Sequence, residues 1–457
     1  MRVGCGWCRV CGPGRSKVTG GACLLSFMVA GFWIISTLRS QGEYREWTPR
    51  SLPTRDPSVK HFIYGRDSDV YLYSAIANDP SRRGNSSATK DQPIRDQLDI
   101  VVTTLDKARV SYECCVLYGD LKRVYVTPAR VYFRYYPTKY SVGAQLKEYF
   151  HPTVYVARQF SCSVPVLKGA PLPAKITLTS SSQCSSDVND YLEVLYPPRH
   201  PGGLAVCAKI AHSGGLDPGK VIEWFEMQRL LGVDKILIYD LGNQESINTV
   251  FRYYRKLGIL DVQPYELPGT PKDRSLKEGF KRTPQFVQDE TMAVLECRHR
   301  MGGYSYVLSH DLDEMVIPRE NISIKTLLEE SLALYPNAAG FYFFTEFFIL
   351  TWGPTHPDER LMVKRYRKTR EPRWECYKYV YVTDRVISML THEIFPKDSY
   401  TTEVLPPDDV ILHHYRQCPS DTWGTCSVTT RIDDVMVRYR DLDETVLKVR
   451  MATGTKS

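Results

Sequence analysis

Residues 204–262 alternate between two hydrophobic patterns, and this alternation restricts the fold more than any other feature of the chain. Short apolar runs at 204–208, 235–240 and 259–262 have the length and composition of buried strands. The two segments between them carry apolar residues at helical spacing, and each ends at a glycine. Such an order predicts a parallel sheet with right-handed crossovers, and ligands of these sheets bind beyond the carboxyl ends of the strands.

Two aspartates follow a further strand of this kind. The run 304–309 reads as a buried strand, and the sequence DLDE at residues 311–314 follows it after one residue. Alternation along an extended chain puts Asp311 and Asp313 on one side, where both carboxylates can face a hard divalent cation and the diphosphate it carries. The motif therefore predicts a nucleotide-sugar site on the same rim as Asp240. An ordinary polar strand end with an acidic turn is the alternative.

The same four letters recur at residues 441–444. There they follow an Arg-Tyr-Arg triplet and lead into a segment that favours a helix, so we interpret them as the acidic first turn of a solvated helix. Context, and not the four letters, favours the copy at 311–314 as the site.

The amino-terminal segment predicts a membrane anchor. Residues 20–38 carry no charge, and 19 helical residues at about 1.5 Å rise span about 28 Å, close to the thickness of a bilayer core. Four basic residues and no acidic residue precede this segment. The positive-inside rule then predicts a cytosolic tail at 1–19, an uncleaved signal anchor at 20–38 and a lumenal remainder, with a cleaved secretory signal as the alternative.

Composition supports a secretory protein and gives no support to a nucleic-acid partner. The formal charge is +7, and four positive charges belong to the short tail, which leaves the rest nearly balanced. Nine of the 13 cysteines follow the apolar segment, and an odd number in an oxidising compartment requires a thiol or an intermolecular bridge. We expect a local disulfide between Cys418 and Cys426. Acceptor sequons for N-glycosylation occur at Asn85 and Asn321.

The remaining pattern divides the chain into three parts. Residues 39–97 are rich in Pro, Ser, Arg and Asp, which is typical of a stem or linker. Residues 98–196 hold short runs of β type separated by Gly, Pro and Asp, which predicts a small antiparallel sandwich. Packing is the favoured role of its Tyr and Phe residues, and carbohydrate binding is the alternative. Residues 197–457 form the α/β domain.

Several motifs taken together resemble glycosyltransferase family 92, formerly a domain of unknown function. The resemblance covers roughly residues 204–416 and is carried by 222–226, 231–240, Tyr254 with 257–258, Gln288 with Cys297, 309–318 and 413–416. It implies a GT-A-like (Rossmann-like) α/β fold with a mostly parallel sheet, preceded here by the β-sandwich-like domain and a single transmembrane helix. It also implies type II topology in the Golgi membrane, a UDP-sugar donor (galactose in characterised members), manganese dependence, and inverting transfer to a glycan.

The metal and phosphate roles follow from this resemblance and from donor chemistry. We assign Asp313 as a direct metal ligand and Asp311 as a ligand through water or a ribose contact. His414 would complete the shell, because manganese accepts imidazole as well as carboxylate. A histidine buried by packing is the alternative for His414, and His413 is the less favoured of the pair. Arg416 is expected to meet phosphate, with a surface ion pair as its alternative.

The other nucleotide contacts and the general base are assigned in the same way. Asp240 is expected to contact uracil or ribose, or else to cap a turn. Gln288 and Lys281 are weaker nucleotide candidates, because the solvated face of a helix explains both. Inversion requires one base opposite the leaving group, and we expect Glu346, a lone acid amid aromatic residues whose proton affinity should be raised. Its rivals are Glu314, Glu375 and His392, and Trp352 is a candidate for stacking on a sugar.

Two functions of other classes stay open at this stage. One is a membrane-anchored glycan-binding protein or an inactive relative. The other is a sulfotransferase, for which the sequence lacks a convincing phosphosulfate cradle. The expected partners of an active enzyme are a UDP-sugar and a glycan on glycoprotein or glycolipid, and a homodimer is left open.

Overall fold

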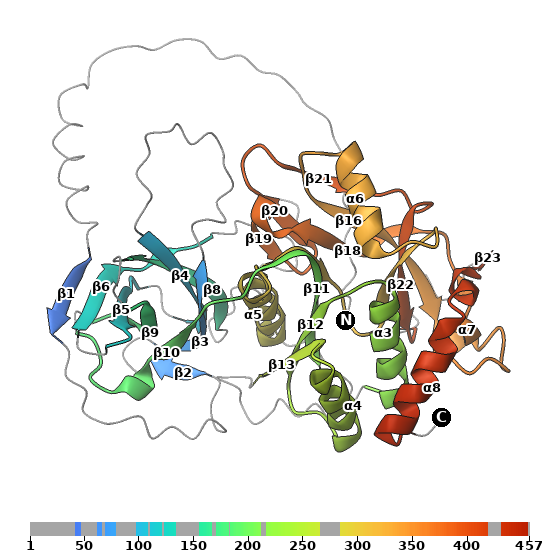
Figure 1. Cartoon of the computed structure of the whole chain (residues 1–457), viewed down its shortest axis with the longest axis horizontal. Helices are drawn as coiled ribbons and strands as arrows, with labels where there is room; N and C mark the ends of the chain where they lie inside the picture. Colours follow the sequence, from blue (N-terminus) through green and yellow to red (C-terminus); the bar gives the residue numbers. More distant parts are fainter. Residues whose placement is uncertain are drawn as a thin grey trace, which may run out of the picture.

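The computed structural model of the chain describes residues 42–46, 62–65, 69–78, 97–107, 110–120, 123–133, 155–166, 171–181, 183–211, 216–265, 284–418 and 431–455. These residues form a β-rich domain and an α/β domain that lie side by side (Figure 1). The predicted anchor at 20–38 falls outside the described ranges. Within them, every helix is too short or too polar to span a bilayer.

The β-rich domain is a single sheet that curls until its two halves face each other. Its order is β1-β6-β5-β9-β10-β3-β4-β8-β7, with β2 paired to β3. The disulfide Cys114–Cys162 joins β5 to β8, which are far apart in this order, so the halves must pack face to face. The expected sandwich-like arrangement is therefore present. Its strands are β1 (Glu43–Glu46), β2 (Ile63–Gly65), β3 (Val70–Asn78), β4 (Gln97–Asp106), β5 (Glu113–Tyr118), β6 (Arg123–Pro128), β7 (Arg130–Val131), β8 (Val156–Pro165), β9 (Pro173–Thr179) and β10 (Leu192–Leu195).

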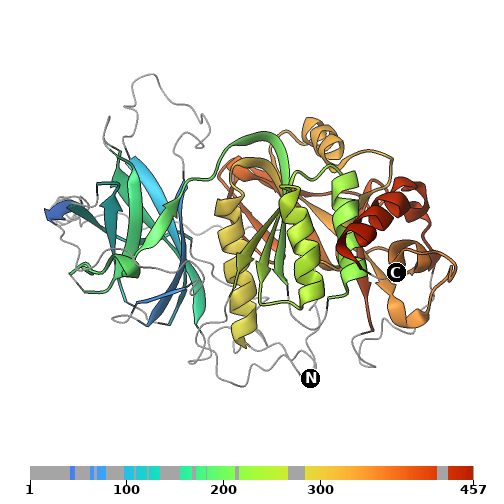
Figure 2. The same cartoon turned by 60° about the horizontal axis from the view of Figure 1, so that its bottom comes forward.

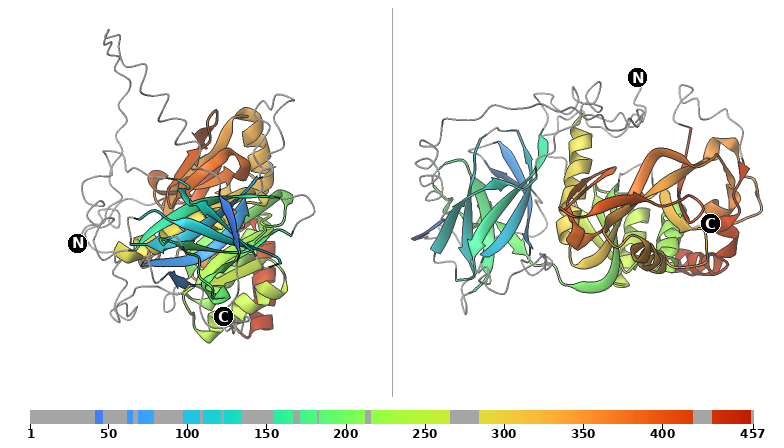
Figure 3. Two further views of the ribbon diagram at one scale, coloured as in Figure 1. Left: turned by 90° about the vertical axis from the view of Figure 1, so that its left-hand side faces the viewer. Right: turned by 90° about the horizontal axis from the view of Figure 1, so that it is seen from above.

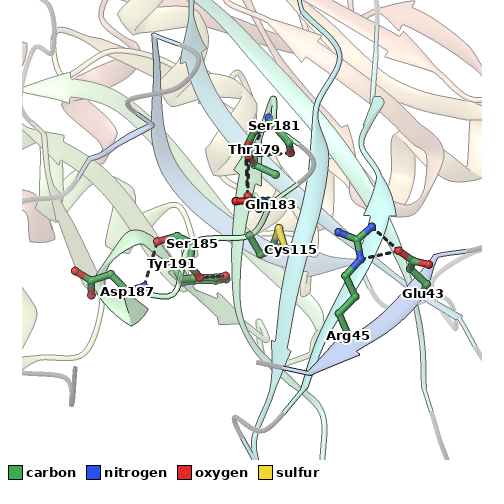
Figure 4. The surroundings of a disulfide bond; sticks show 10 residues. Glu43, Arg45, Cys115, Thr179, Ser181, Gln183, Ser185, Asp187 and Tyr191 are labelled. Atoms are coloured by element: carbon green, nitrogen blue, oxygen red, sulfur yellow. Dashed lines mark hydrogen bonds and ion pairs between the residues drawn. A yellow bond between two sulfur atoms is a disulfide. The ribbon is translucent and has the colours of Figure 1, made fainter. Parts of the chain in front are cut away.

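A second disulfide fixes the loop that leads out of β9. Cys115 on β5 bonds Cys184, and Figure 4 shows the polar contacts around this bridge. The Thr179 hydroxyl accepts from the Ser181 N–H at 3.1 Å, and the Tyr191 hydroxyl donates to the Ser185 carbonyl at 2.7 Å. The disulfide thus ties the loop to β5, and the hydrogen bonds hold its local conformation.

The segment that we interpreted as a stem contributes strands to this domain. β1, β2 and β3 all lie within residues 39–97, and β3 occupies the middle of the sheet between β10 and β4. The reason is visible in residues 70–78, where seven of the nine residues are buried in one β-type run. The residues on either side of this strand are polar, so the composition of residues 39–97 as a whole indicated a linker.

The α/β domain is built on a sheet of order β13-β12-β11-β14-β18-β16-β22-β15, with β21 on β16. β13, β12, β11 and β14 are parallel, as the sequence predicted, and antiparallel pairing begins at β18. The strands are β11 (His200–Ala211), β12 (Lys235–Asp240), β13 (Leu260–Pro264), β14 (Tyr304–Ser309), β15 (Glu314–Pro318), β16 (Ala338–Ile349), β17 (Lys368–Thr369), β18 (Arg373–Val382), β19 (Val386–Leu390), β20 (Glu393–Pro396), β21 (Thr401–Val404), β22 (Val410–Arg416) and β23 (Arg431–Ile432).

Helices cover both faces of this sheet (Figure 2). α3, α4 and α8 pack on one face, and α5 packs on the other, between the sheet and the β-rich domain (Figure 3). The second DLDE copy forms the first turn of α8, as predicted. The helices are α3 (Pro218–Leu230), α4 (Glu245–Lys256), α5 (Pro284–Arg300), α6 (Ile324–Leu334), α7 (Met362–Arg365) and α8 (Asp441–Thr453).

Local sequence signals explain why α3 begins and ends where it does. Asp217 is its N-cap, and one carboxylate oxygen accepts the Lys220 N–H at 2.9 Å. Pro218 occupies the first helical position, where no N–H is needed. Gly232 has a φ of 85°, which an L side chain adopts only with strain, and it turns the chain toward β12.

Candidate active site

Strands from the parallel part and from the mixed part of the sheet meet at one edge. The parallel strands β11, β12 and β14 end there, and β18 begins there because it runs antiparallel to β14. β16 and β22 also end at this edge, while β15 begins there opposite β22. We call this edge the carboxyl rim. The sequence predicted the nucleotide-sugar site at this edge.

Three side chains on the carboxyl rim offer ligand atoms to one point. Asp313, Glu314 and His414 each present an oxygen or nitrogen atom, and these atoms lie within 4.8 Å of one another. Asp313 Oδ2 is 3.3 Å from His414 Nε2, and Glu314 Oε1 is 3.5 Å from His414 Nδ1. The reason is register, because Glu314 lies directly opposite His414 in the β15–β22 ladder. The predicted neighbours Asp313 and His414 are therefore brought together.

Burial gives the three residues different surroundings. The Asp313 side chain is 51% exposed, whereas those of Glu314 and His414 are 1% and 9% exposed. Glu314 Oε1 and His414 Nδ1 are buried without a hydrogen-bond partner, so the group has unused ligand capacity. Two carboxylates and an imidazole are a donor set that suits manganese. The residues present thus fit a divalent cation.

Asp311 is held by two buried lysines. Lys209 Nζ lies 3.1 Å from Asp311 Oδ1, and Lys378 Nζ lies 2.9 Å from Asp311 Oδ2. Burial alone would raise the pKa of Asp311, but Lys209 and Lys378 lower this pKa well below its usual range. Lys378 also lies 3.2 Å from Glu314 Oε2, which in turn accepts the Asp311 N–H at 2.8 Å. The lysines therefore fix the acidic turn, and a third of the Asp311 side chain stays exposed.

Sequence reasoning missed both lysines, although each left a signal. Lys209 stands in the otherwise apolar strand β11, and Lys378 stands among the aromatic residues of β18. Their side chains are only 3% and 2% exposed, and a buried lysine requires an acidic partner. Lys209 has a φ of 47°, at a register shift between Cys207 and Ile210 in the β11–β12 ladder. This bulge re-aims the side chain at Asp311, which no periodicity predicts.

The predicted base Glu346 does not lie with the metal group. Glu346 on β16 is opposite His413 in the β16–β22 ladder, whereas the next residue is opposite His414. Successive side chains of a strand point to opposite faces, so Glu346 and His414 face away from each other. Arg319 donates to Glu346 Oε1 at 2.7 Å, and Arg431 binds the same oxygen. Burial does raise the pKa of Glu346 to about 7, as we expected for an acid amid aromatic residues, but its place in the fold does not suit a general base.

Glu346 and His413 belong to a second acidic cluster. Together with Asp433 they offer ligand atoms within 4.8 Å of one another. Arg319 and Arg431 both bind Glu346 Oε1, and Arg319 also binds Asp433, whereas Glu346 Oε2 and His413 Nε2 are buried without a hydrogen-bond partner. The two cations already balance the carboxylates of this cluster, so we assign the metal to the group at Asp313, which has a more exposed ligand.

Comparison with known proteins now identifies the chain. The sequence profile of glycosyltransferase family 92 matches residues 203–448, which is more than half of the chain and contains the whole carboxyl rim. The chain belongs to glycosyltransferase family 92. A curated relative, beta-1,4-galactosyltransferase galt-1 of Caenorhabditis elegans, is 24% identical over 148 residues. That match spans 31% of this chain and 31% of the relative.

Two solved bacterial structures are similar to this family 92 chain at a much lower level. TarS residues 1–349 of S. aureus has a TM-score of 0.25 at 10% identity and covers 55% of this chain and 71% of its own. HddC of Yersinia pseudotuberculosis has a TM-score of 0.24 at 10% identity and covers 49% of this chain and 97% of its own. Similarities of this size do not define a fold.

The remaining predicted nucleotide residues of the family 92 chain have different positions. Asp240 ends β12 on the rim, and its Oδ1 accepts from the Gly242 N–H at 2.9 Å and from Asn243 Nδ2 at 2.5 Å, so it caps a turn there. Arg416 ends β22, two residues beyond His414 and thus on the same face. Lys281 lies outside the described residues.

Gln288 lies near the start of α5, and its buried side chain contacts the β-rich domain, which does not favour the predicted nucleotide role. Its side chain is 2% exposed, on α5 where the two domains meet. Gln288 Oε1 accepts the Ala157 N–H of β8 at 2.9 Å. A buried amide that satisfies a backbone N–H of the neighbouring domain has a structural role.

The other candidates for base and stacking lie at or beyond the rim. Glu375 is in the first half of β18, with a third of its side chain exposed and Arg373 Nη1 at 3.4 Å. His392 Nδ1 is 2.7 Å from the Tyr377 carbonyl oxygen, and burial lowers the pKa of His392 to about 3. Trp352 is half-buried in the short turn of 3-10 helix that follows β16.

A cavity of about 950 Å³ lies at the opposite edge of the sheet. It is lined by His200, Lys235 and Tyr304, the first residues of β11, β12 and β14. Ligands of parallel sheets bind beyond the carboxyl ends, so this cavity is not the expected donor site.

The α/β domain also contains disulfide-bonded cysteines. Besides the two in the β-rich domain, Cys207 on β11 bonds Cys297 on α5. Cys418 is also disulfide-bonded, while Cys426, its predicted partner, lies outside the described residues. Cys376 carries a thiol, in keeping with the odd number of cysteines.

Proposed function

We propose that this family 92 chain is a metal-dependent inverting glycosyltransferase that moves a hexose, galactose from UDP-galactose, onto a glycan acceptor. The observation that carries the proposal is the group Asp313, Glu314 and His414 at the carboxyl rim, with its unused ligand capacity. The name of the curated relative supports galactose as the sugar.

Asp313 and His414, with Glu314 beneath them, would hold manganese. When bound, the ion would neutralise the negative charge that develops on the diphosphate as the sugar leaves. Lys209 and Lys378 keep Asp311 ionised and fixed, so that its exposed edge can accept from a donor hydroxyl. Asp240 at the end of β12 and Arg416 at the end of β22 lie on the same rim and are proposed to contact the nucleoside and the phosphates.

The acceptor hydroxyl has to lose its proton on the far side of the sugar from the diphosphate. Glu314 is buried and paired with Lys378, and burial raises its pKa, so it cannot reach an acceptor. Glu375 is the rival that combines a carboxylate with exposure on the rim. We therefore propose Glu375 as the base in place of Glu346.

The proposed setting is the Golgi membrane. The uncharged segment 20–38 would anchor the chain as a type II protein, with both domains in the lumen. Disulfides that link strands and helix across the described residues support an oxidising compartment.

A donor screen tests the proposal. The full-length chain should release UDP from UDP-galactose faster than from UDP-glucose or N-acetylated analogues, and only with manganese and a glycan acceptor present. Asp313→Asn should abolish release. A membrane-anchored glycan-binding protein or an inactive relative would bind glycans but release no UDP from any donor, and that result would refute the proposal.

A further inference from the structure

β18 carries a large bulge where it reaches the carboxyl rim. Phe343 of β16 is opposite Lys378, and Thr345, two residues further along, is opposite Arg373. Between these two pairs, β16 has one residue, Phe344, whereas β18 has four, residues 374–377. These extra residues of β18 form the bulge. Cys376 within it has a φ of 49°, which is rare for a residue other than glycine. Bulges and strained residues of this kind occur next to active sites, where they re-aim side chains.

The bulge places two aromatic rings on one side of the strand. Trp374 and Tyr377 are three residues apart, so in a regular strand they would point to opposite faces. Here their rings stack, with centroids 4.2 Å apart and planes 15° from parallel. Tyr342 and Phe344 of β16 support the stack edge-on, at 5.9 and 5.3 Å from the Trp374 ring. Trp374 nevertheless remains 39% exposed, so part of the stack is accessible to solvent.

This aromatic stack is next to the acidic site along β18. Tyr377 precedes Lys378, whose ammonium group binds both Asp311 and Glu314. The His392 ring lies 5.8 Å from the Tyr377 ring. In the sheet order, β14 and its acidic turn lie between β12 with Asp240 and β18 with the stack. A donor nucleotide over β11 and β12 would therefore leave the β18 side free for a second substrate.

We infer that the Trp374–Tyr377 stack is the binding platform for a pyranose ring of the acceptor glycan. This inference rests on the proposed function, since only a transferase needs an acceptor there. A pyranose has an apolar C–H face that covers an aromatic ring, and hydroxyls at its edge that need polar partners. Arg373 and Glu375, which flank Trp374, supply such partners. The proposed base Glu375 thus adjoins the ring whose hydroxyl it would deprotonate.

The test uses the full-length chain and separates acceptor from donor. Binding to a printed array of N- and O-linked oligosaccharides selects the acceptor, and steady-state kinetics then use the glycan that binds best. Trp374→Ala should weaken array binding and raise the acceptor KM about tenfold or more, with UDP affinity in manganese unchanged. Trp374→Phe should keep most of the affinity. Tyr335→Ala, which removes another exposed aromatic ring, is the matched control and should change neither.

Each outcome decides the inference. An acceptor KM for Trp374→Ala within about twofold of wild type, equal losses of UDP and acceptor affinity, or a wild-type chain that binds no glycan on the array would overturn it. Failure of the proposed function looks different, because the wild-type chain would then neither release UDP nor bind UDP more tightly with manganese. Array binding needs no catalysis, so the platform can be judged in that case too.

Discussion

The two aspartates of the motif at 311–314 differ in role although only one residue separates them. Asp313 is exposed beside His414 and has the position of a ligand, whereas Asp311 is neutralised by Lys209 and Lys378. Burying two ammonium groups is costly unless each meets a carboxylate in good geometry. The lysines and the acidic turn therefore require each other, and the turn is fixed before any donor arrives.

At the same scale, Glu346 should matter for stability and not for transfer. Glu346→Ala leaves Arg319 and Arg431 without a shared buried partner, and breaking such a pair should lower the free energy of unfolding by about 3 kcal/mol. Denaturant unfolding measures the loss, and UDP affinity in manganese should stay that of wild type. The control is Glu359→Ala, whose more exposed pair with Arg367 should contribute about 1 kcal/mol or less.

Glu375 should show the reverse behaviour. Glu375→Gln removes a proton acceptor at a third-exposed position and should lower kcat by about a hundredfold, with little change in stability or UDP affinity. Transfer kinetics with UDP-galactose measure this. A variant with wild-type kcat would remove Glu375 from consideration as the base.

At the scale of elements, Glu223 on α3 joins three helices. Arg450 of α8 lies 3.0 Å from Glu223 Oε1, and the Val363 N–H of α7 donates to Oε2 at 3.3 Å. Burial nevertheless raises the pKa of Glu223 to about 7, against the opposing effects of the Met362 N–H and Arg450. The folded chain thus holds a proton that the unfolded chain loses above its lower pKa.

A pH dependence of stability follows from that shift. The contribution of Glu223 is fully present below about pH 4.5 and is lost as the pH rises to about 7, which amounts to about 3 kcal/mol. Glu223→Gln should flatten the fall in unfolding free energy over this range, as measured by denaturant unfolding at several pH values. Glu330→Gln, on the exposed face of α6, is the control, and equal slopes for Glu223→Gln and wild type would refute the assignment.

Elements that follow local rules could be predicted, and those that break them could not. Asp217, Pro218 and Gly232 bound α3 because capping and backbone freedom are properties of single residues. The bulges at Lys209 and Cys376 were not foreseen, because a non-glycine residue at positive φ is imposed by the surrounding sheet. The position of Glu346, away from the metal group, was not predicted for a related reason. Strand register decides which face of the sheet a side chain occupies, and the sequence does not show this register.

At the scale of the whole molecule, α5 joins the two domains. Gln288 accepts the Ala157 N–H, and Gln159 Nε2 of the β-rich domain donates to the Leu295 carbonyl at 3.0 Å. Aromatic residues of the β-rich domain, among them Tyr73, pack into the same core as α5. The sequence predicted the two domains but not this junction, because contacts between distant segments leave no periodic signal.

Gln288→Ala should loosen this junction and leave the site intact. The Ala157 N–H would lose its acceptor, which costs about 1 kcal/mol or somewhat more. Hydrogen exchange at residues 155–160 should become faster, while UDP affinity stays unchanged. A large loss of UDP affinity would instead restore the nucleotide-binding role that the sequence suggested.

The central claim is that the carboxyl rim binds a divalent cation together with a nucleoside diphosphate. Calorimetric titration of UDP into the full-length chain, with and without manganese, tests it most directly. We expect manganese to tighten UDP binding at least about tenfold in wild type, equivalent to 1.4 kcal/mol, and to have no effect in Asp313→Asn. Equal UDP affinity with and without the metal, or an Asp313→Asn variant that responds like wild type, would contradict the account.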